Sequence, residues 1–211
     1  MEASGKPKTA SIFPNTIKTM KPVQASTINE IVYLKLEKAI ISGQLLPGTR
    51  LAAKDLANQM KVSTIPVREA LARLEVRGLV AIVPQKGAIV NQQSVESIKE
   101  LLEIRLILES AAIKKVIPIV SGETINLLIE TNKAYEEAWQ QSKAAKMLDA
   151  AKYFHDCLYR DKHMPNLIRM LNQIWDIINP YYHIMFRSQE GKLHTGVNYH
   201  TKIIEGMQEK S

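Results

Sequence analysis

Three arginines on one short segment are the first residues of this sequence that could do chemistry. The segment follows Ser63. Its apolar residues stand at the spacing i, i+3, i+4 and i+7, which is typical of a buried helix face: Val67, Ala70, Leu71 and Leu74. Arg68, Arg73 and Arg77 lie off this stripe, so their side chains can reach outward. Because a guanidinium fork matches guanine edges and phosphate oxygens, these arginines predict contacts with nucleic acid.

The elements that must position the arginines are predicted around them. A shorter helical pattern covers residues 52–60, and a tight turn leads from it to Ser63. Ser63 is a good N-cap, because its hydroxyl can accept a backbone N–H of the first turn. Pro66 falls inside that turn, where a missing N–H costs little. Gly78 stands where a helix needs a left-handed stop.

A β-hairpin with a basic tip is predicted directly after Gly78. Residues 79–83 are apolar and β-branched, residues 84–87 form a turn, and residues 88–90 return. Helix, turn, helix and hairpin together predict a winged helix-turn-helix, whose second helix fits the major groove of B-DNA. The alternative is an ordinary helical hairpin packed on a small sheet. The N-cap, the outward arginines and the basic hairpin favour DNA binding over this alternative.

A dense pattern runs through this stretch: Gly43-x-Leu45-x-Pro47-Gly48-x-Arg50-Leu51, Leu56-Ala57 and Val62-Ser63-x-x-Pro66-Val67-Arg68-Glu69-Ala70-Leu71-x-Arg73-Leu74-Glu75-x-x-Gly78-Leu79-Val80. With this pattern, about residues 28–90 resemble the DNA-binding domain of the GntR family of bacterial transcription regulators. Thr64 departs from the family, which usually has an arginine there that contacts DNA. The predicted DNA-binding residues are Lys54, Ser63, Thr64, Pro66, Arg68, Arg73, Lys86 and Gly87.

The excess of positive charge lies entirely in the first half of the chain. The net charge is +7, and residues 1–91 hold 13 Lys and Arg against 6 Asp and Glu, whereas residues 92–211 hold 15 against 15. A basic module joined to a neutral one is typical of a DNA-binding domain with a separate partner domain.

The composition predicts a globular cytoplasmic protein. The chain is 45% hydrophobic and 23% charged, which excludes a disordered chain. Its single cysteine, Cys157, cannot form an internal disulfide, which suits a reducing compartment. No apolar run approaches the roughly 20 residues of a membrane span, and no signal peptide is recognisable.

Three parts are expected along the chain: a flexible basic tail over residues 1–26, the winged helix-turn-helix over 27–92, and a helical domain over 93–211 for effector binding and dimerisation. Helical patterns in this last domain cover about 94–116, 122–141, 144–159, 166–178 and 193–207, with a further helical piece at 181–187. Pro180 is expected to end the fourth helix. The fold class is therefore mainly α, with a winged helix-turn-helix followed by an all-α bundle.

Arg105 is the candidate effector-binding residue of the bundle. Arg105 and Glu109 stand four apart on a helix that is apolar nearly all round, so they can form an ion pair. One interpretation is a buried pair that only fixes the helix. The other is that Arg105 partly faces a cavity and holds an anionic ligand with its planar fork.

His155 and His200 lie on apolar stripes of two different helices, where a histidine is more often a core residue than a ligand. Together with Arg105 and Glu109, they resemble the helical FCD domain of the fatty-acid-regulator (FadR-type) branch of the GntR family. That resemblance implies a divalent metal such as Zn, Ni or Mn, held by an Asp and three His beside a small carboxylate. Ala151 stands at the Asp position, and the chain ends at Ser211 before a last His. The metal is therefore lost, weakly bound, or completed by residues beyond this sequence.

The predicted function is sequence-specific DNA binding for transcription regulation, as a repressor controlled by a small carboxylate effector. The expected partners are double-stranded DNA with a palindromic operator and a second copy of the chain in a homodimer. One alternative is an effector-independent dimeric DNA-binding protein with a degenerate pocket. A metal-dependent enzyme using His155 and His200 is a further alternative, against which stands the lack of a paired general base.

Overall fold

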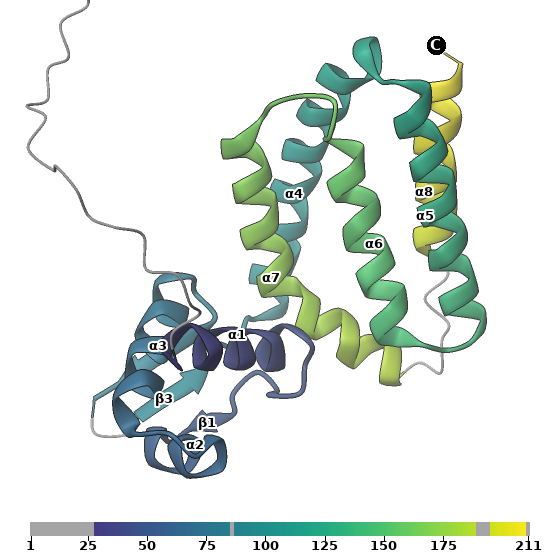
Figure 1. Ribbon diagram of the computed structural model, residues 1–211. Helices are drawn as coiled ribbons and strands as arrows, with labels where there is room; N and C mark the ends of the chain where they lie inside the picture. The colour runs from purple at the N-terminus through teal and green to yellow at the C-terminus, as the bar shows by residue number, and fades with distance from the viewer. Residues whose placement is uncertain (1–27, 85–86, 189–194, 210–211) are drawn as a thin grey trace, which may run out of the picture.

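The computed structural model describes residues 28–84, 87–188 and 195–209. They form a small winged-helix domain and a larger helical bundle (Figure 1). The predicted basic tail over residues 1–26 lies outside the described residues. No described helix is long and apolar enough to cross a membrane.

The N-terminal domain has the predicted order of helices and hairpin. Its helices are α1 (Ile28–Ile41), α2 (Ala53–Met60) and α3 (Thr64–Val76). Its strands β1 (Arg50–Leu51), β2 (Val80–Val83) and β3 (Gly87–Val90) form an antiparallel sheet in the order β1-β3-β2. The predicted winged helix-turn-helix is confirmed, and the short strand β1 is an element that the sequence pattern did not indicate.

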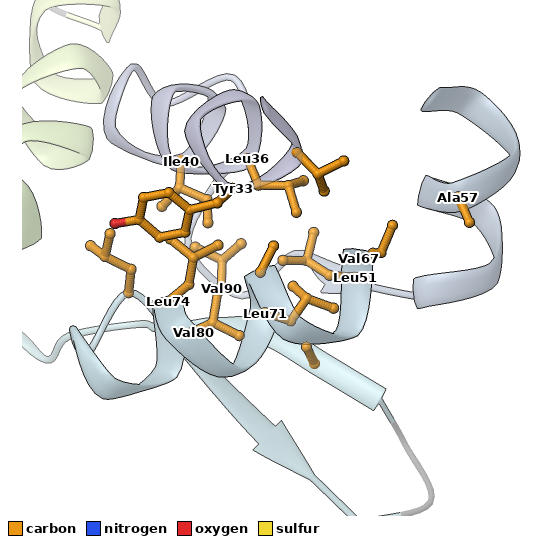
Figure 2. Packing of buried hydrophobic residues seen from close by; sticks show 14 residues of the cluster. Tyr33, Leu36, Ile40, Leu51, Ala57, Val67, Leu71, Leu74, Val80 and Val90 are labelled. Atoms are coloured by element: carbon orange, nitrogen blue, oxygen red, sulfur yellow. The ribbon is translucent and has the colours of Figure 1, made fainter. Parts of the chain in front are cut away.

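One apolar core holds these elements together (Figure 2). Leu36 of α1 and Leu74 of α3 are 1% and 0% exposed, and Val80 and Val90 close the core from the sheet. Tyr33 lies at one edge of this core, and its hydroxyl oxygen points away from it. The core therefore fixes the position of α3 against α1 and the sheet.

The turn between α2 and α3 depends on backbone geometry more than on capping. Lys61 ends α2 with φ 56°, and its N–H bonds to the carbonyls of Ala57 and Asn58. Ser63 is the N-cap residue of α3 as predicted, but its side chain makes no capping hydrogen bond, so the expected hydroxyl cap is wrong. Gly78 has φ 72° after α3, the left-handed stop that the sequence predicted.

The C-terminal domain is the predicted helical bundle. Its helices are α4 (Val95–Val116), α5 (Gly122–Gln140), α6 (Ala144–Leu158), α7 (Pro165–Ser188) and α8 (Thr195–Gln208), with a short 3-10 helix at Ile117–Ile119. In Figure 1, α6 stands between α5 and α7, and α8 lies along α5. The core is centred on side chains that are fully buried: Val116, Leu128, Phe154, Leu158 and Met207.

Helix α7 differs from the sequence prediction. Pro180 lies inside this helix and does not end it. A proline in a helix removes one hydrogen bond and bends the axis, and α7 is visibly bent in Figure 1. The helix continues past Pro180 because its second half packs on the N-terminal domain: the Asn179 side chain donates to the Ile41 carbonyl at 3.2 Å, and Gly43 lies against His183. Tertiary contacts here outweigh the local helix-breaking signal.

Candidate nucleic-acid interface and bundle cavity

The three arginines on and just after α3 have different surroundings, and among them only Arg68 is exposed without a described ion pair. Arg68 lies one turn into α3 and is exposed. Thr64, half-buried, begins the helix on the same side. This end of α3 is therefore free to enter a groove and bring Arg68 to a base edge.

Arg73 is held against α1. Its Nη1 lies 2.7 Å from a Glu30 carboxylate oxygen, and its guanidinium carbon lies 3.8 Å from the centre of the Tyr33 ring. The hydrogen bond to Glu30 raises the pKa of Arg73 above its ordinary value. The structure thus gives Arg73 a role in joining α3 to α1, which competes with the DNA contact predicted for it.

Arg77, just after α3, joins both domains. It forms ion pairs with Glu37 of α1 and with Asp176 of α7, and it donates to the Tyr33 hydroxyl. The carboxyl groups of Glu37 and Asp176 are mostly buried, at 18% and 15% side-chain exposure. This cluster connects the end of α3, the predicted DNA-recognition helix, directly to α7 of the bundle.

The remaining predicted DNA-binding residues surround α3. Lys54 on α2 and Ser63 at the N-cap are exposed. Gly87 begins β3 with φ 87°, a left-handed conformation that favours glycine at the base of the wing. Pro66 is buried, so it fixes the first turn of α3 and does not reach outward. Lys86 lies outside the residues that the structure describes.

The bundle contains a cavity of about 570 Å³. Its wall is mostly apolar and aromatic and includes Leu102, Leu106, Met147, Trp175, Phe186 and Ile203. A few polar side chains interrupt it, among them Arg105, Glu109 and His155. An apolar cavity of this size with few polar groups is typical of a small-molecule site.

Arg105 is the centre of the polar network in this cavity. Its Nε donates to Glu109 at 3.0 Å, and its Nη2 lies 3.0 Å from His155 Nε2. Its guanidinium carbon is 4.7 Å from the centre of the Trp175 ring. Because the guanidinium can only donate, His155 Nε2 accepts, and the neutral ring carries its proton on Nδ1, which is 3.2 Å from Glu109. Arg105 is therefore both in an ion pair with Glu109 and in the wall of a cavity, and its contact with an anionic ligand stays a prediction.

His200 lies beside His155, although α8 and α6 are far apart in sequence. The centres of the two rings are 5.5 Å apart, and His200 stacks on Phe154 at 3.9 Å. Asn132 contacts His200 Nδ1 at 3.1 Å. Burial lowers the pKa of His200 to about 4. Burial and then the Arg105 charge hold the pKa of His155 well below its ordinary value, so both rings are neutral at pH 7.

These residues do not fit the divalent metal that the family resemblance implied. No group of three metal-binding side chains exists among the described residues. The Arg105 guanidinium is hydrogen-bonded to His155 Nε2, so a cation would meet a positive charge there. Ala151 lines the cavity where an acidic ligand would be needed. Two imidazoles fall short of the roughly four ligands of a firm site.

Sequence reasoning did not single out several residues that the structure places at the cavity or on the exposed side of α3. Trp175 and Tyr182 line the cavity from α7, and Asn132 supports His200 from α5. The apolar periodicity of α7 indicated a buried Trp175, but periodicity cannot distinguish a core position from a cavity wall. Ile65, exposed at the start of α3, carried no signal other than its place off the buried stripe.

The comparisons with known proteins agree with both domains. The model of bacterial regulatory proteins of the gntR family matches residues 28–90, and the FCD domain model matches residues 100–211. An uncharacterized HTH-type transcriptional regulator from the TAR-I ttuE-ttuC' intergenic region of Agrobacterium vitis is 33% identical, over 60% of this chain and 75% of that protein. The HTH-type transcriptional repressor RspR of Escherichia coli K12 is 32% identical, over 68% and 62%.

A solved structure shares the fold. The structure of E. coli McbR/YncC superposes with a TM-score of 0.75, at 24% sequence identity, and covers 87% of each chain. In sequence, the HTH-type transcriptional regulator McbR of E. coli K12 is 27% identical, over 72% of this chain and 69% of that protein.

Proposed function

This chain belongs to the GntR family of bacterial regulatory proteins and is a DNA-binding transcription regulator with an FCD domain, and we propose that it is a cytoplasmic repressor released by a small carboxylate. It binds a palindromic operator as a homodimer. The observation that carries the proposal is the cavity of about 570 Å³ in the bundle, with the Arg105 guanidinium in its wall.

In this proposal, α3 lies in the major groove with its N-terminal end toward the bases. Arg68 contacts a base or a phosphate, and Ser63 and Thr64 contact the backbone at the helix start. Lys54 on α2 and the wing at Lys86 and Gly87 bind phosphates and the minor groove. Phosphate contacts position the protein, and base contacts select the site.

A homodimer is supported by the exposed apolar side of α4. Ile104 and Ile107 are three residues apart on one side of α4, lie outside the cavity wall and are 38% and 67% exposed, although large apolar patches are normally covered. A two-fold interface uses the same patch on both copies, which would place two α3 helices on the two halves of a palindrome.

Arg105 supports a carboxylate as the effector. A guanidinium has five N–H donors, and its contacts with Glu109 and His155 use one each, so donors remain for a ligand anion. The aromatic and aliphatic walls would bury the rest of a small acid. An effector-independent regulator would be expected to have a filled bundle, so the cavity favours control by a ligand. No observation on the described residues favours the alternative of a metal-dependent enzyme. Repression is supported by the relative RspR, which is named a transcriptional repressor.

The DNA contact is tested by comparing two arginines of one helix. Operators are first selected from random duplexes with the full chain. Arg68→Ala should weaken operator binding roughly 5- to 150-fold, the equivalent of about 1–3 kcal/mol for a base contact, measured by fluorescence anisotropy at fixed salt. Arg73→Ala is the matched control and should weaken binding much less, because Arg73 is paired with Glu30. Equal losses for the two variants would remove Arg68 from its assigned role.

The effector is tested by thermal shift against a panel of small carboxylic acids. A ligand at 100 times its dissociation constant should stabilise the fold by about 2.7 kcal/mol. Arg105→Met should abolish the shift, whereas Arg169→Met, an exposed arginine on α7, should retain it. A shift that Arg105→Met leaves unchanged would argue against Arg105 as the carboxylate ligand.

A further inference from the structure

Apolar side chains lie along the solvent-facing side of α3, the proposed recognition helix, and this row is called the outward line. Ile65 and Val76 are 64% and 89% exposed, and Ala72 between them is exposed as well. Ile65 and Ala72 are seven residues apart, which is close to two full turns, so they share one side of α3. Val67, Ala70 and Leu74 occupy the opposite side and are buried.

Three polar side chains of α3 that flank this line, those of Glu69, Arg73 and Glu75, are bound to other elements. The Glu69 carboxylate accepts a hydrogen bond from Asn29 of α1, and Arg73 pairs with Glu30. On the other flank, Glu75 accepts the backbone N–H of Ile82 at 2.9 Å. These contacts turn polar groups away from the outward line and leave Ile65 beside the exposed Arg68.

We propose that Ile65 is a specificity-determining residue that reads the C5-methyl group of a thymine in the operator. The inference rests on the placement of α3 in the major groove proposed above. In a helix-turn-helix, the N-terminal residues of the recognition helix meet the base edges. Ile65 is the second residue of α3, so its side chain enters the groove with Arg68.

Thymine is the base that this side chain selects. The thymine methyl is the apolar group on the major-groove edge, where every other group that distinguishes the base pairs is a hydrogen-bond donor or acceptor. An isoleucine placed against those polar edges would leave their donors and acceptors without hydrogen-bond partners, which disfavours the other bases at this position. Against a thymine methyl, both apolar groups leave water.

The test removes the methyl group from the DNA and the side chain from the protein. In an operator selected with the full chain, each thymine is replaced in turn by deoxyuridine, which differs only in lacking the methyl. Wild-type affinity should fall about fourfold at one thymine of each half-site, the factor expected for burying one methyl group. With Ile65→Ala, the same replacement should change affinity less than about 1.5-fold.

Two further variants serve as controls. Ile65→Val keeps a branched apolar side chain and should retain the sensitivity to deoxyuridine. Val76→Ala removes an exposed apolar side chain of the same helix, about 16 Å along the axis from Ile65, and should leave the deoxyuridine profile of wild type unchanged.

The possible results separate this inference from the proposed function. If Arg68→Ala loses the operator but no thymine distinguishes wild type from Ile65→Ala, the inference is wrong and the groove placement stands. If Arg68→Ala and Ile65→Ala both bind as wild type does, or if no operator is selected at all, the groove placement fails and the inference fails with it.

Discussion

Lowering the pH from 7 to about 4.5 should destabilise the helical domain through its two buried histidines. His200 has a pKa of about 4 in the folded protein, against 6.5 as the ordinary value, and the pKa of His155 is shifted in the same direction. Below pH 6.5 the unfolded chain takes up protons that the folded chain excludes. The contribution of the neutral buried histidines to the free energy of unfolding is therefore complete above about pH 6.5 and is lost as the pH falls toward 4. For His200 alone it amounts to about 3 kcal/mol.

The measurement is the free energy of unfolding from urea titrations followed by tryptophan fluorescence, repeated at several pH values. Both tryptophans, Trp139 and Trp175, lie in the bundle, so the signal reports this domain. His200→Gln should flatten the dependence of stability on pH between 4 and 6.5. His163→Gln changes an exposed histidine and should leave that dependence unaltered. A pH slope in His200→Gln as steep as in wild type would show that His200 is not the group responsible.

Local signals in the sequence were sufficient for most of the fold. Ser94 and Ser121 are residue types that favour helix N-caps, and each hydroxyl accepts the backbone N–H three residues on, at 3.1 Å. The helical periodicity also placed α5 and α6 to within a residue or so at each end. These signals act within one or two turns, where neighbouring residues determine the conformation.

The prediction from sequence was wrong or incomplete where contacts between residues far apart in the sequence determine the conformation. Pro180 was expected to end a helix, but contacts between α7 and the N-terminal domain carry the helix through it. Arg73 was assigned to DNA because it lies off the buried stripe of α3, and helical spacing could not reveal its partner Glu30, 43 residues earlier. Pro66 was assigned to the interface although its position in the first turn of α3 is buried.

The cavity could be predicted only in part, because its contacts also join residues that are far apart in the sequence. Arg105, His155 and His200 were chosen as candidate ligand residues from three separate helical stripes, and the structure brings them together. The sequence could not show that Arg105 donates to His155, so it left a metal open. The hydrogen bond between these two side chains is what makes the site unsuitable for a cation.

Helix α7 is the physical connection between this cavity and the DNA-binding domain. Trp175 lies in the cavity wall under Arg105, and the next residue, Asp176, pairs with Arg77 beside α3. Ile177 packs against the winged-helix core, and the Tyr181 hydroxyl accepts the backbone N–H of Gln93 at 2.6 Å. In the proposed effector response, a ligand that displaced Trp175 would move a segment that is ion-paired to Arg77 at the end of α3.

Replacing Arg77 with methionine should break this connection. Removal of one partner leaves the Glu37 and Asp176 carboxylates mostly buried and without their cation, which costs about 3–5 kcal/mol for fully buried groups and less here because water reaches all three side chains. We expect a loss of about 2–3 kcal/mol in the free energy of unfolding. Effector-dependent release of DNA, typically a 5- to 150-fold change in affinity, should fall to less than about twofold.

A double-mutant cycle distinguishes the ion pair from a general loss of packing. Arg77→Met, Asp176→Asn and the double variant should give a coupling energy of about 1–3 kcal/mol, because Asp176→Asn removes the charge that Arg77 balances. Arg169→Met removes an exposed arginine on the same helix and should change neither stability nor the effector response. A coupling energy near zero, with the effector response intact in Arg77→Met, would mean that the signal leaves the cavity by another route. The rest of the α1 and α7 interface, through Asn179 and Ile41, would then be the contact to test.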